Sequence, residues 1–472
     1  MSPLPDFVTR PAGQWLESAR GTVGGITWGP SLKAAKWAVH SLFSNVEFGT
    51  LIVLDEMDGT SNIYSGNHAA SNTQEKPASG PERLTSPPRV ELVVKKSAFW
   101  MRLVLFADMG FAESFMLGEV ECNDLTDFFQ LFIANRNQLG NGTTLMSTFS
   151  SLASTLARRT NTLHNALLNI SAHYDISNEM FAAFLSPDMT YSCPIWKHSH
   201  ADEPEETLEE AQHRKLQTFI SEAHIKSTDH VLEIGTGWGS FAIAAVQTTG
   251  CRVTSLTLSI EQKVLAEERI AEAGLSDRIE VLLMDYRALP VPERPYDKIV
   301  SIEMLEAVGK EYLSTYFACI DRLLKKDGGI AVFQCITMPE GRYEAYSKSE
   351  DFINHYIFPG GHLPSITQLL NHISTESQGT LIVERVNNIG GHYAKTLRLW
   401  REAFLDKFDS DIKPALIEKQ GKMKDDEVAV FRRKWEYYFR YCEAGFLSKT
   451  LGDVIITVGR EGTAELMEGI PT

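Results

Sequence analysis

The sequence predicts an α/β protein in which a smaller α+β unit precedes a parallel, doubly wound, Rossmann-like sheet. From residue 229 onward, short strand-like runs alternate with helical segments, the order expected of a parallel sheet with helices on both faces. The first of these strands runs into a glycine-rich loop that opens a helix. The chain has 472 residues, 43% of them hydrophobic. This is enough for about two to four structural units with cores of their own.

The N-terminal part, residues 1–140, is expected to form the smaller unit. Strand-like runs lie at 50–56 and 90–96, and the second is expected to continue through 99–106. Between them, residues 59–89 are rich in Ser, Asn, Gly and Pro. Such a composition buries little apolar surface, so it predicts a long flexible hairpin loop.

Helices are expected on either side of the junction between the two units. A helix with an apolar face is predicted at 124–136, and residues 145–168 are expected to be helical within a connector over 141–172. The larger second domain then spans 173–472. Its strands are predicted at 230–234, 252–258, 278–284, 297–302 and 329–336.

The net charge of −16 argues against nucleic acid as a partner, because phosphate binding depends on Lys and Arg. The acidic block at 201–210 is interpreted as a solvated loop and helix start. The six cysteines form no CxxC pair and no Cys/His cluster, so a disulfide scaffold or metal site is not expected. Neither a signal peptide nor a membrane-spanning run is visible, and a cytoplasmic location is predicted.

The strongest local signal is the segment from Glu233 through Gly235 and Gly237 to Gly239. Glycines at a strand-to-helix turn let a ligand approach the backbone, and the helix that follows offers free N–H groups. A tight turn with no ligand can have the same GxGxG pattern. The position after a strand and before a helix favours a nucleotide-type cofactor.

The residues after the next strands indicate which cofactor this is. A dinucleotide fold uses GxGxxG with an acid about 20 residues on, whereas this chain has GxGxG and its second strand ends near Thr257. Asp285 and Tyr286 follow the third strand, where a carboxylate can face the amine of adenine and a ring can stack on it. This combination indicates S-adenosylmethionine rather than NAD. Ser259 and Gln262 are predicted to cap the next helix in an S-x-x-Q box.

At this point the sequence resembles the cyclopropane-fatty-acyl-phospholipid synthases. Eight blocks carry the resemblance in the family order. They lie at 110–125, 173–178, 191–193, 231–242, 257–262, 303–309, 334–337 and 388–393. The resemblance implies a Rossmann-like class I methyltransferase and adds Tyr191 and Ser192 to the cofactor-binding residues.

The resemblance also implies a reaction. In that family, a cis double bond of a phospholipid acyl chain takes a methylene group from S-adenosylmethionine through a carbocation, and bound bicarbonate removes the proton. The residues that match the bicarbonate ligands are Cys193, Glu306, Gln334, Ile336 and Tyr393. Bacterial members usually carry His where this chain has Gln334, and an amide cannot hold a proton. Tyr393, with Tyr191 and Trp196, is expected to stabilise positive charge through ring faces.

The lipid substrate implies transient contact with a membrane surface. In the segment 395–434 basic residues outnumber acidic ones, and RRKWEYYF at 432–439 suits either an interfacial helix or a helix packed on the core. The N-terminal unit is the other candidate for lipid contact, and a homodimer is possible. The alternatives are C-methylation giving a branched lipid, methylation of a small-molecule amine, and a lipid-binding protein without turnover.

Overall fold

The computed structural model describes residues 30–66, 87–139, 177–198, 204–348, 350–421, 423–468 and 470–471. The chain divides into two compact units, Met1–Asn169 and Ile170–Thr472. The connector predicted over 141–172 lies outside the described residues, as does most of the loop predicted over 59–89.

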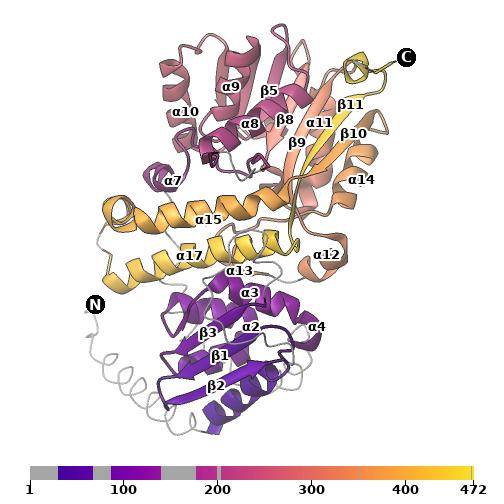
Figure 1. Ribbon diagram of the computed structural model, residues 1–472. Coiled ribbons are helices and arrows are strands. Elements are labelled where there is room, and N and C mark those ends of the chain that lie inside the picture. Colours follow the sequence, from indigo (N-terminus) through magenta and orange to yellow (C-terminus); the bar gives the residue numbers. More distant parts are fainter. Residues whose placement is uncertain are drawn as a thin grey trace, which may run out of the picture. The chain divides into compact units, whose positions relative to one another are not determined.

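A four-stranded sheet forms the centre of the first unit (Figure 1). Its strands are β1 (Thr50–Asp55), β2 (Thr60–Ser65), β3 (Arg89–Val94) and β4 (Val120–Cys122), in the order β2-β1-β3-β4. β1 pairs with β2 antiparallel and with β3 parallel. The prediction of one hairpin loop over 59–89 was therefore wrong, because this segment contains β2 and joins two parallel strands.

Residues 99–106 are helical, so the prediction that they continue the strand before them was also wrong. They belong to α2 (Ala98–Met116), which bends sharply at Ala107, where φ is +51°. Phe99, Trp100 and Met101 are all buried, whereas a strand with one solvated face would bury alternate residues. A short apolar run does not by itself distinguish a buried helix from a buried strand. Gly110 lets the two halves of α2 meet, because a Cβ there would lie 2.0 Å from the carbonyl oxygen of Arg102.

The remaining helices of the first unit begin where polar residues can cap them. α3 (Leu125–Ala134) confirms the helix predicted at 124–136, and the Asp124 carboxylate accepts from the first free N–H groups of α3. The short α4 (Arg136–Leu139) follows. Residues 30–43 are also helical.

The second unit contains a seven-stranded sheet, and its first five strands confirm those predicted. These are β5 (His230–Ile234), β6 (Arg252–Thr257), β7 (Ile279–Leu283), β8 (Lys298–Ile302), β9 (Ile330–Thr337), β10 (Leu381–Asn388) and β11 (Gly452–Arg460). The order is β10-β11-β9-β8-β5-β6-β7, and β5 to β9 are parallel while β11 runs antiparallel to β9 and β10. The carboxyl ends of β5 to β9 therefore meet at one edge of the sheet.

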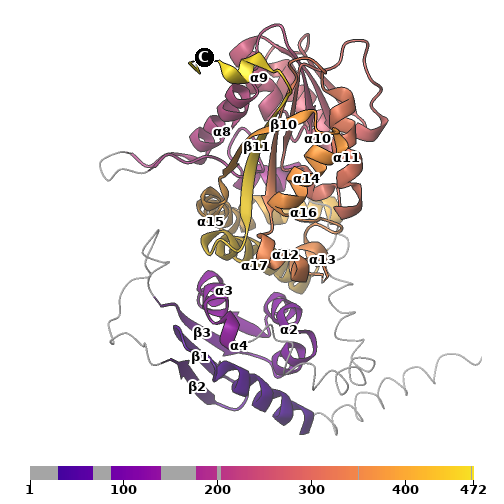
Figure 2. The same ribbon diagram turned by 90° about the vertical axis from the view of Figure 1, so that its right-hand side faces the viewer.

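Helices cover both faces of this sheet. The helices of the second unit are α7 (Asn178–Phe184), α8 (Leu208–Glu222), α9 (Ser240–Thr249), α10 (Ile260–Glu272), α11 (Leu313–Leu323), α12 (Glu340–Tyr346), α13 (Phe352–Tyr356), α14 (Ile366–Glu376), α15 (Gly390–Asp406), α16 (Lys413–Gln420) and α17 (Asp425–Leu447), of which α15 and α17 lie at one end of the sheet (Figure 1). α8 and α9 lie on one side, and α11 and α14 on the other (Figure 2). α8 opens in a capping box of Thr207 and Glu210, as expected of the acidic block.

The C-terminal basic-aromatic segment is packed against the protein. α15 and α17 lie side by side (Figure 1). Trp435, Tyr437, Tyr438 and Phe439 of α17 are all buried, so these rings are not presented on the surface to a membrane. Of the two alternatives for 432–439, the structure shows the helix packed on the core. Within the described residues, no helix combines the length and apolar character needed to cross a membrane.

We predict that Trp435→Ala destabilises the second unit by about 3–5 kcal/mol, because it leaves a cavity among buried rings. The Trp435 indole packs on Phe184, Phe404 and Phe439. Arg432→Ala, at an exposed position three residues earlier, is the matched control and should change stability by less than about 1 kcal/mol. Denaturant unfolding of the two variants measures the difference. Equal, small effects would show that Trp435 does not belong to the core.

Candidate functional site

The glycine loop lies between the end of β5 and the start of α9, at the carboxyl edge of the sheet. Gly235, Gly237 and Gly239 have φ angles of +103°, +52° and +86°, which side chains rarely adopt. No atom lies within 4 Å of the position that a Cβ of Gly237 would take, so the loop leaves open space there. The residues fit a cofactor that approaches the backbone at a helix N-terminus.

Glu233 is the last residue but one of β5, next to this loop, and it is bonded from the neighbouring strand. The Ser255 hydroxyl of β6 donates to its carboxylate, and Glu233 is buried. Burial raises the pKa of Glu233 to about 8, although the hydrogen bond from Ser255 opposes this shift.

The predicted residues after β6 form one turn. The Thr257 hydroxyl donates to Oε1 of Gln262 at 2.9 Å and accepts from the Ser259 N–H at 3.1 Å. Ser259 caps α10 by accepting from the Gln262 N–H. The predicted capping box is therefore half formed, because the Gln262 side chain bonds to Thr257 instead of the Ser259 backbone. This turn keeps three polar side chains beside the glycine loop.

Asp285 and Tyr286 follow β7 at the same edge. The Asp285 carboxylate accepts from the Arg287 guanidinium at 2.6 Å, and this interaction lowers the pKa of Asp285. The Tyr286 ring packs edge-on against Tyr316. Facing adenine remains a prediction for both side chains.

Tyr191 and Ser192 belong to a network of polar groups, and Tyr191 packs on Phe181, which also packs on Trp238 of the glycine loop. The Tyr191 hydroxyl bonds to that of Tyr438 on α17 at 2.9 Å. The Ser192 hydroxyl accepts from the Lys215 ammonium at 2.6 Å. Lys215 is completely buried, and burial lowers its pKa. A cation is thus enclosed within the second unit.

Three of the five predicted catalytic residues surround one carboxylate, that of Glu303. Oε1 of Glu303 accepts from the Cys193 main-chain N–H at 2.7 Å and from Nε2 of Gln334 at 2.8 Å. Oε2 accepts from the Tyr393 hydroxyl at 2.8 Å. Gln334 also donates to Asp453 at 2.9 Å. The structure therefore brings Cys193, Gln334 and Tyr393 together, but around a carboxylate that the sequence analysis did not choose.

The other two predicted residues form a pair beside this cluster. The Ile336 main-chain N–H donates to Oε1 of Glu306, while Oε2 of Glu306 is buried without a hydrogen-bond partner. Burial, and next the negative charge of Glu303, raise the pKa of Glu306 to about 8. Glu306 can therefore hold a proton near neutral pH.

Aromatic rings line the cluster. The Tyr393 ring packs on Trp400 and Phe446, and Tyr191 packs on Trp400, with ring centroids 4.7–5.8 Å apart. Trp196 donates to the Thr396 hydroxyl at 3.0 Å, and the Lys395 ammonium lies 4.0 Å from its ring centre. A cation of the protein therefore already occupies one face of Trp196.

The sequence analysis missed Glu303, Asp453 and Lys215. A signal for Glu303 was present, since it directly follows β8 at the carboxyl edge and begins a block that was already noted for Glu306. Asp453 is an acid at the start of an apolar strand, a position that favours a buried functional group. Lys215 gave no signal, because it lies on an amphipathic helix among other polar residues.

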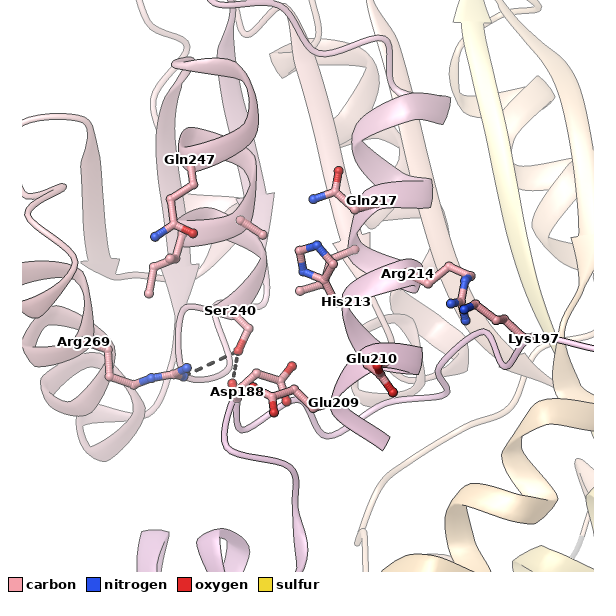
Figure 3. A pocket seen from close by; sticks show the side chains of 13 residues that line it. Asp188, Lys197, Glu209, Glu210, His213, Arg214, Gln217, Ser240, Gln247 and Arg269 are labelled. Carbon is pink, nitrogen blue, oxygen red and sulfur yellow. Dashed lines mark hydrogen bonds between the residues drawn. The ribbon is translucent and has the colours of Figure 1, made fainter. Parts of the chain in front are cut away.

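An open hollow of about 640 Å³ lies outside this site, beside α8, α9 and Arg269 of α10 (Figure 3). Its lining includes many charged and polar side chains, among them Asp188, His213 and Arg214, and none of the predicted site residues. The Ser240 hydroxyl donates to the Asp188 carbonyl there. Such a lining does not suit an apolar substrate.

Comparison with known proteins identifies a family and its relatives. Residues 161–455 match the family described as mycolic acid cyclopropane synthetase. The chain is 39% identical over 365 residues to a tuberculostearic acid methyltransferase of Mycobacterium tuberculosis, covering 75% of this chain and 79% of the relative. It is 32% identical to the cyclopropane-fatty-acyl-phospholipid synthase of Escherichia coli, covering 76% and 85%.

Solved structures agree with this comparison. A mycolic acid cyclopropane synthase in complex with SAH and CTAB matches with a TM-score of 0.52 and 29% identity, covering 62% of this chain and 97% of that one. A coclaurine N-methyltransferase matches with a TM-score of 0.56 and 21% identity, which shows the shared fold. The second unit therefore has the class I methyltransferase fold that the sequence predicted.

We predict that stability falls more steeply with pH in the wild type than in Glu233→Gln. The pKa of Glu233 is about 8 in the folded protein, against 4.5 for an ordinary Glu. Between these values the folded chain holds more protons than the unfolded one, so rising pH favours unfolding. The Glu233→Gln variant lacks this group. From about pH 5 to about pH 8 its unfolding free energy should therefore rise by about 1–4 kcal/mol relative to that of the wild type.

Thermal unfolding without cofactor, followed across this pH range, measures the effect. Glu465→Gln is the matched control, because Lys298 and Lys226 bond to Glu465 and its pKa is lowered. Its stability difference from the wild type should therefore stay constant over the same range. Parallel curves for Glu233→Gln and the wild type would contradict the assignment.

Proposed function

The chain is an S-adenosylmethionine-dependent methyltransferase that belongs to the mycolic acid cyclopropane synthetase family, and we propose that it alkylates the cis double bond of an unsaturated phospholipid acyl chain. The product proposed is a cyclopropane fatty acyl chain. The observation that carries the proposal is the aromatic-lined carboxylate cluster at the same sheet edge as the glycine loop. A carbocation needs such an environment, with rings and oriented dipoles and little water.

Different residues of the chain would bind the cofactor and the acyl chain. S-Adenosylmethionine, when bound, supplies the methyl carbon. The glycine loop with Thr257, Ser259 and Asp285 would hold the cofactor at the carboxyl edge. Tyr393 and Trp400 would line the path of the acyl chain and face positive charge. The Gln334 amide and the Cys193 N–H donate to the carboxylate of Glu303, which would face the acyl chain.

Bicarbonate, which the family resemblance implied as the proton acceptor, does not fit beside these groups. The Cys193 N–H, the Gln334 amide and the Tyr393 hydroxyl already donate to Glu303. The Ile336 N–H already donates to Glu306. We therefore assign no step to bicarbonate.

A second product is supported by the comparisons. The relative that is 39% identical is named as a tuberculostearic acid methyltransferase, and the cyclopropane synthase of Escherichia coli is less similar. A hydride shift before proton loss would give a methylene-branched chain instead of a ring. Both products require an alkene, a methyl donor and one proton acceptor. The phospholipid substrate implies transient contact with a membrane surface, and a homodimer remains a prediction.

We expect the protein, incubated with labelled S-adenosylmethionine and vesicles of cis-monounsaturated phospholipid, to add one labelled carbon to the acyl chain. Mass spectrometry gives the gain in mass. Proton NMR distinguishes the protons of a cyclopropane ring from the alkene protons of a methylene-branched chain. Vesicles of saturated phospholipid are the control and should take no label. Label that appears on an added amine, or on no lipid at all, would contradict the proposal.

We expect Tyr393→Phe to lower kcat by about 10- to 150-fold, because it removes one hydrogen bond to a charged carboxylate. Tyr296→Phe is the matched control, since Tyr296 is also buried but precedes β8 at the opposite edge of the sheet. Its kcat should stay within about twofold of the wild type. Unchanged turnover in Tyr393→Phe would mean that the cluster is not the reaction centre.

A further inference from the structure

Glu303 is positioned by the backbone as well as by its hydrogen bonds. It directly follows β8, and its φ of +46° lies in the left-handed region that residues other than glycine rarely occupy. Its N–H donates to the Gln334 carbonyl at 3.0 Å, which fixes this turn to β9. Such strain persists only where the surroundings impose it, and it is concentrated at functional sites. Here the turn directs the carboxylate away from the strand and into the cluster.

The three groups that donate to Glu303 have no further hydrogen to offer a separate anion. The Cys193 N–H and the Tyr393 hydroxyl have one hydrogen each, and both donate to Glu303. The two hydrogens of the Gln334 amide are shared among Glu303, Asp453 and the Cys193 carbonyl, at 2.8, 2.9 and 3.2 Å. A separate anion would have to displace Glu303 to reach these donors. The carboxylate of Glu303 thus accepts from three of the groups that the family resemblance implied as bicarbonate ligands.

We propose that Glu303 is the built-in proton acceptor of this enzyme and that it replaces bicarbonate. This inference rests on the proposed function. The π electrons of the alkene form a bond to the methyl carbon, the carbon–sulfur bond breaks with its electrons on sulfur, and a carbocation remains on the acyl chain. Glu303 takes a proton from the added methyl group, and the electrons of that C–H bond close the ring. Glu303 then releases the proton to solvent before the next turnover.

The charges around Glu303 favour its ionised form over that of its neighbours. Glu303 accepts three hydrogen bonds of 2.7–2.8 Å, and the positive charge of Lys215 also stabilises its anion. Asp453 is completely buried and accepts from Gln334. Burial, and next the charge of Glu303, raise the pKa of Asp453 well above its usual range. The arrangement that agrees with both observations is a neutral Asp453 beside an anionic Glu303.

Accessibility separates Glu303 from the groups that hold it. Gln334 and Asp453 are 0% exposed, whereas Glu303 is half-buried and keeps surface that a substrate can touch. Burial also raises the pKa of Glu303, which makes its carboxylate a stronger base than an ordinary one. A purely structural carboxylate would need neither property.

The first experiment compares turnover in CO₂-free buffer and in buffer with millimolar bicarbonate. Wild-type turnover should be the same in both, because the base belongs to the chain. Glu303→Gln, which keeps the size of the side chain, should lose about 100-fold or more of kcat in either buffer. It should retain the melting temperature and the affinity for S-adenosylmethionine. Glu465→Gln, another partly exposed glutamate, is the control and should keep full turnover.

A wild-type enzyme that loses activity without bicarbonate and regains it on addition would overturn the proposal, as would full activity in Glu303→Gln. A second measurement does not depend on turnover. NMR of isotopically labelled bicarbonate should show no bound ion in the wild type and a bound ion in Glu303→Gly, where glycine suits the left-handed turn. Bicarbonate bound to the wild type would again overturn the proposal. If no lipid is alkylated by the wild type, the proposed function fails, while this binding comparison still decides whether Glu303 replaces the ion.

Discussion

The site depends on one electrostatic constraint: a carboxylate that stands among aromatic rings must have its charge compensated by donors of the protein. Glu303 meets this constraint through a main-chain N–H, an amide and a phenol, each within 2.8 Å. These donors come from the segment before α8, from β9 and from α15, so the carboxylate joins three distant parts of the chain. Removing any of them leaves charge uncompensated, at a cost of about 1–3 kcal/mol or more.

The topology of the sheet explains why these parts can meet. β5 to β9 are parallel, so the loops after them share one edge, and the cofactor turn and the carboxylate cluster come from neighbouring strands. The antiparallel β11 adds Asp453 at the same edge, because its first residues pair with the last residues of β9. Trp400 of α15 and Phe446 of α17 then pack on the Tyr393 ring of the cluster. Chemistry that needs a dry site is thereby placed beside a loop that is open to a cofactor.

Different parts of the chain were predictable to different degrees. The strands of the second unit were predictable because their apolar runs are short and are separated by clear turns. Residues 99–106 were not, because an apolar run that is buried on all sides has no period that distinguishes helix from strand. Capping was predicted only in part, since Ser259 caps α10 while the Gln262 side chain bonds to Thr257. The competing group is the Thr257 hydroxyl before the helix, which donates to Gln262 and accepts from the Ser259 N–H, and the S-x-x-Q spacing alone did not reveal it.

The sequence by itself determined the class of fold, the glycine loop, the family and the set of residues that includes Cys193, Gln334 and Tyr393. These features depend on local residue patterns and on the order of the family's sequence motifs, and both can be seen in the sequence without knowledge of the fold. Only the tertiary structure decided what these residues surround. Glu303 receives its hydrogen bonds from residues 31 to 110 positions away, and such distances are set by the pairing of strands and the packing of helices. The sequence analysis therefore placed an ion where the fold places a side chain of the protein.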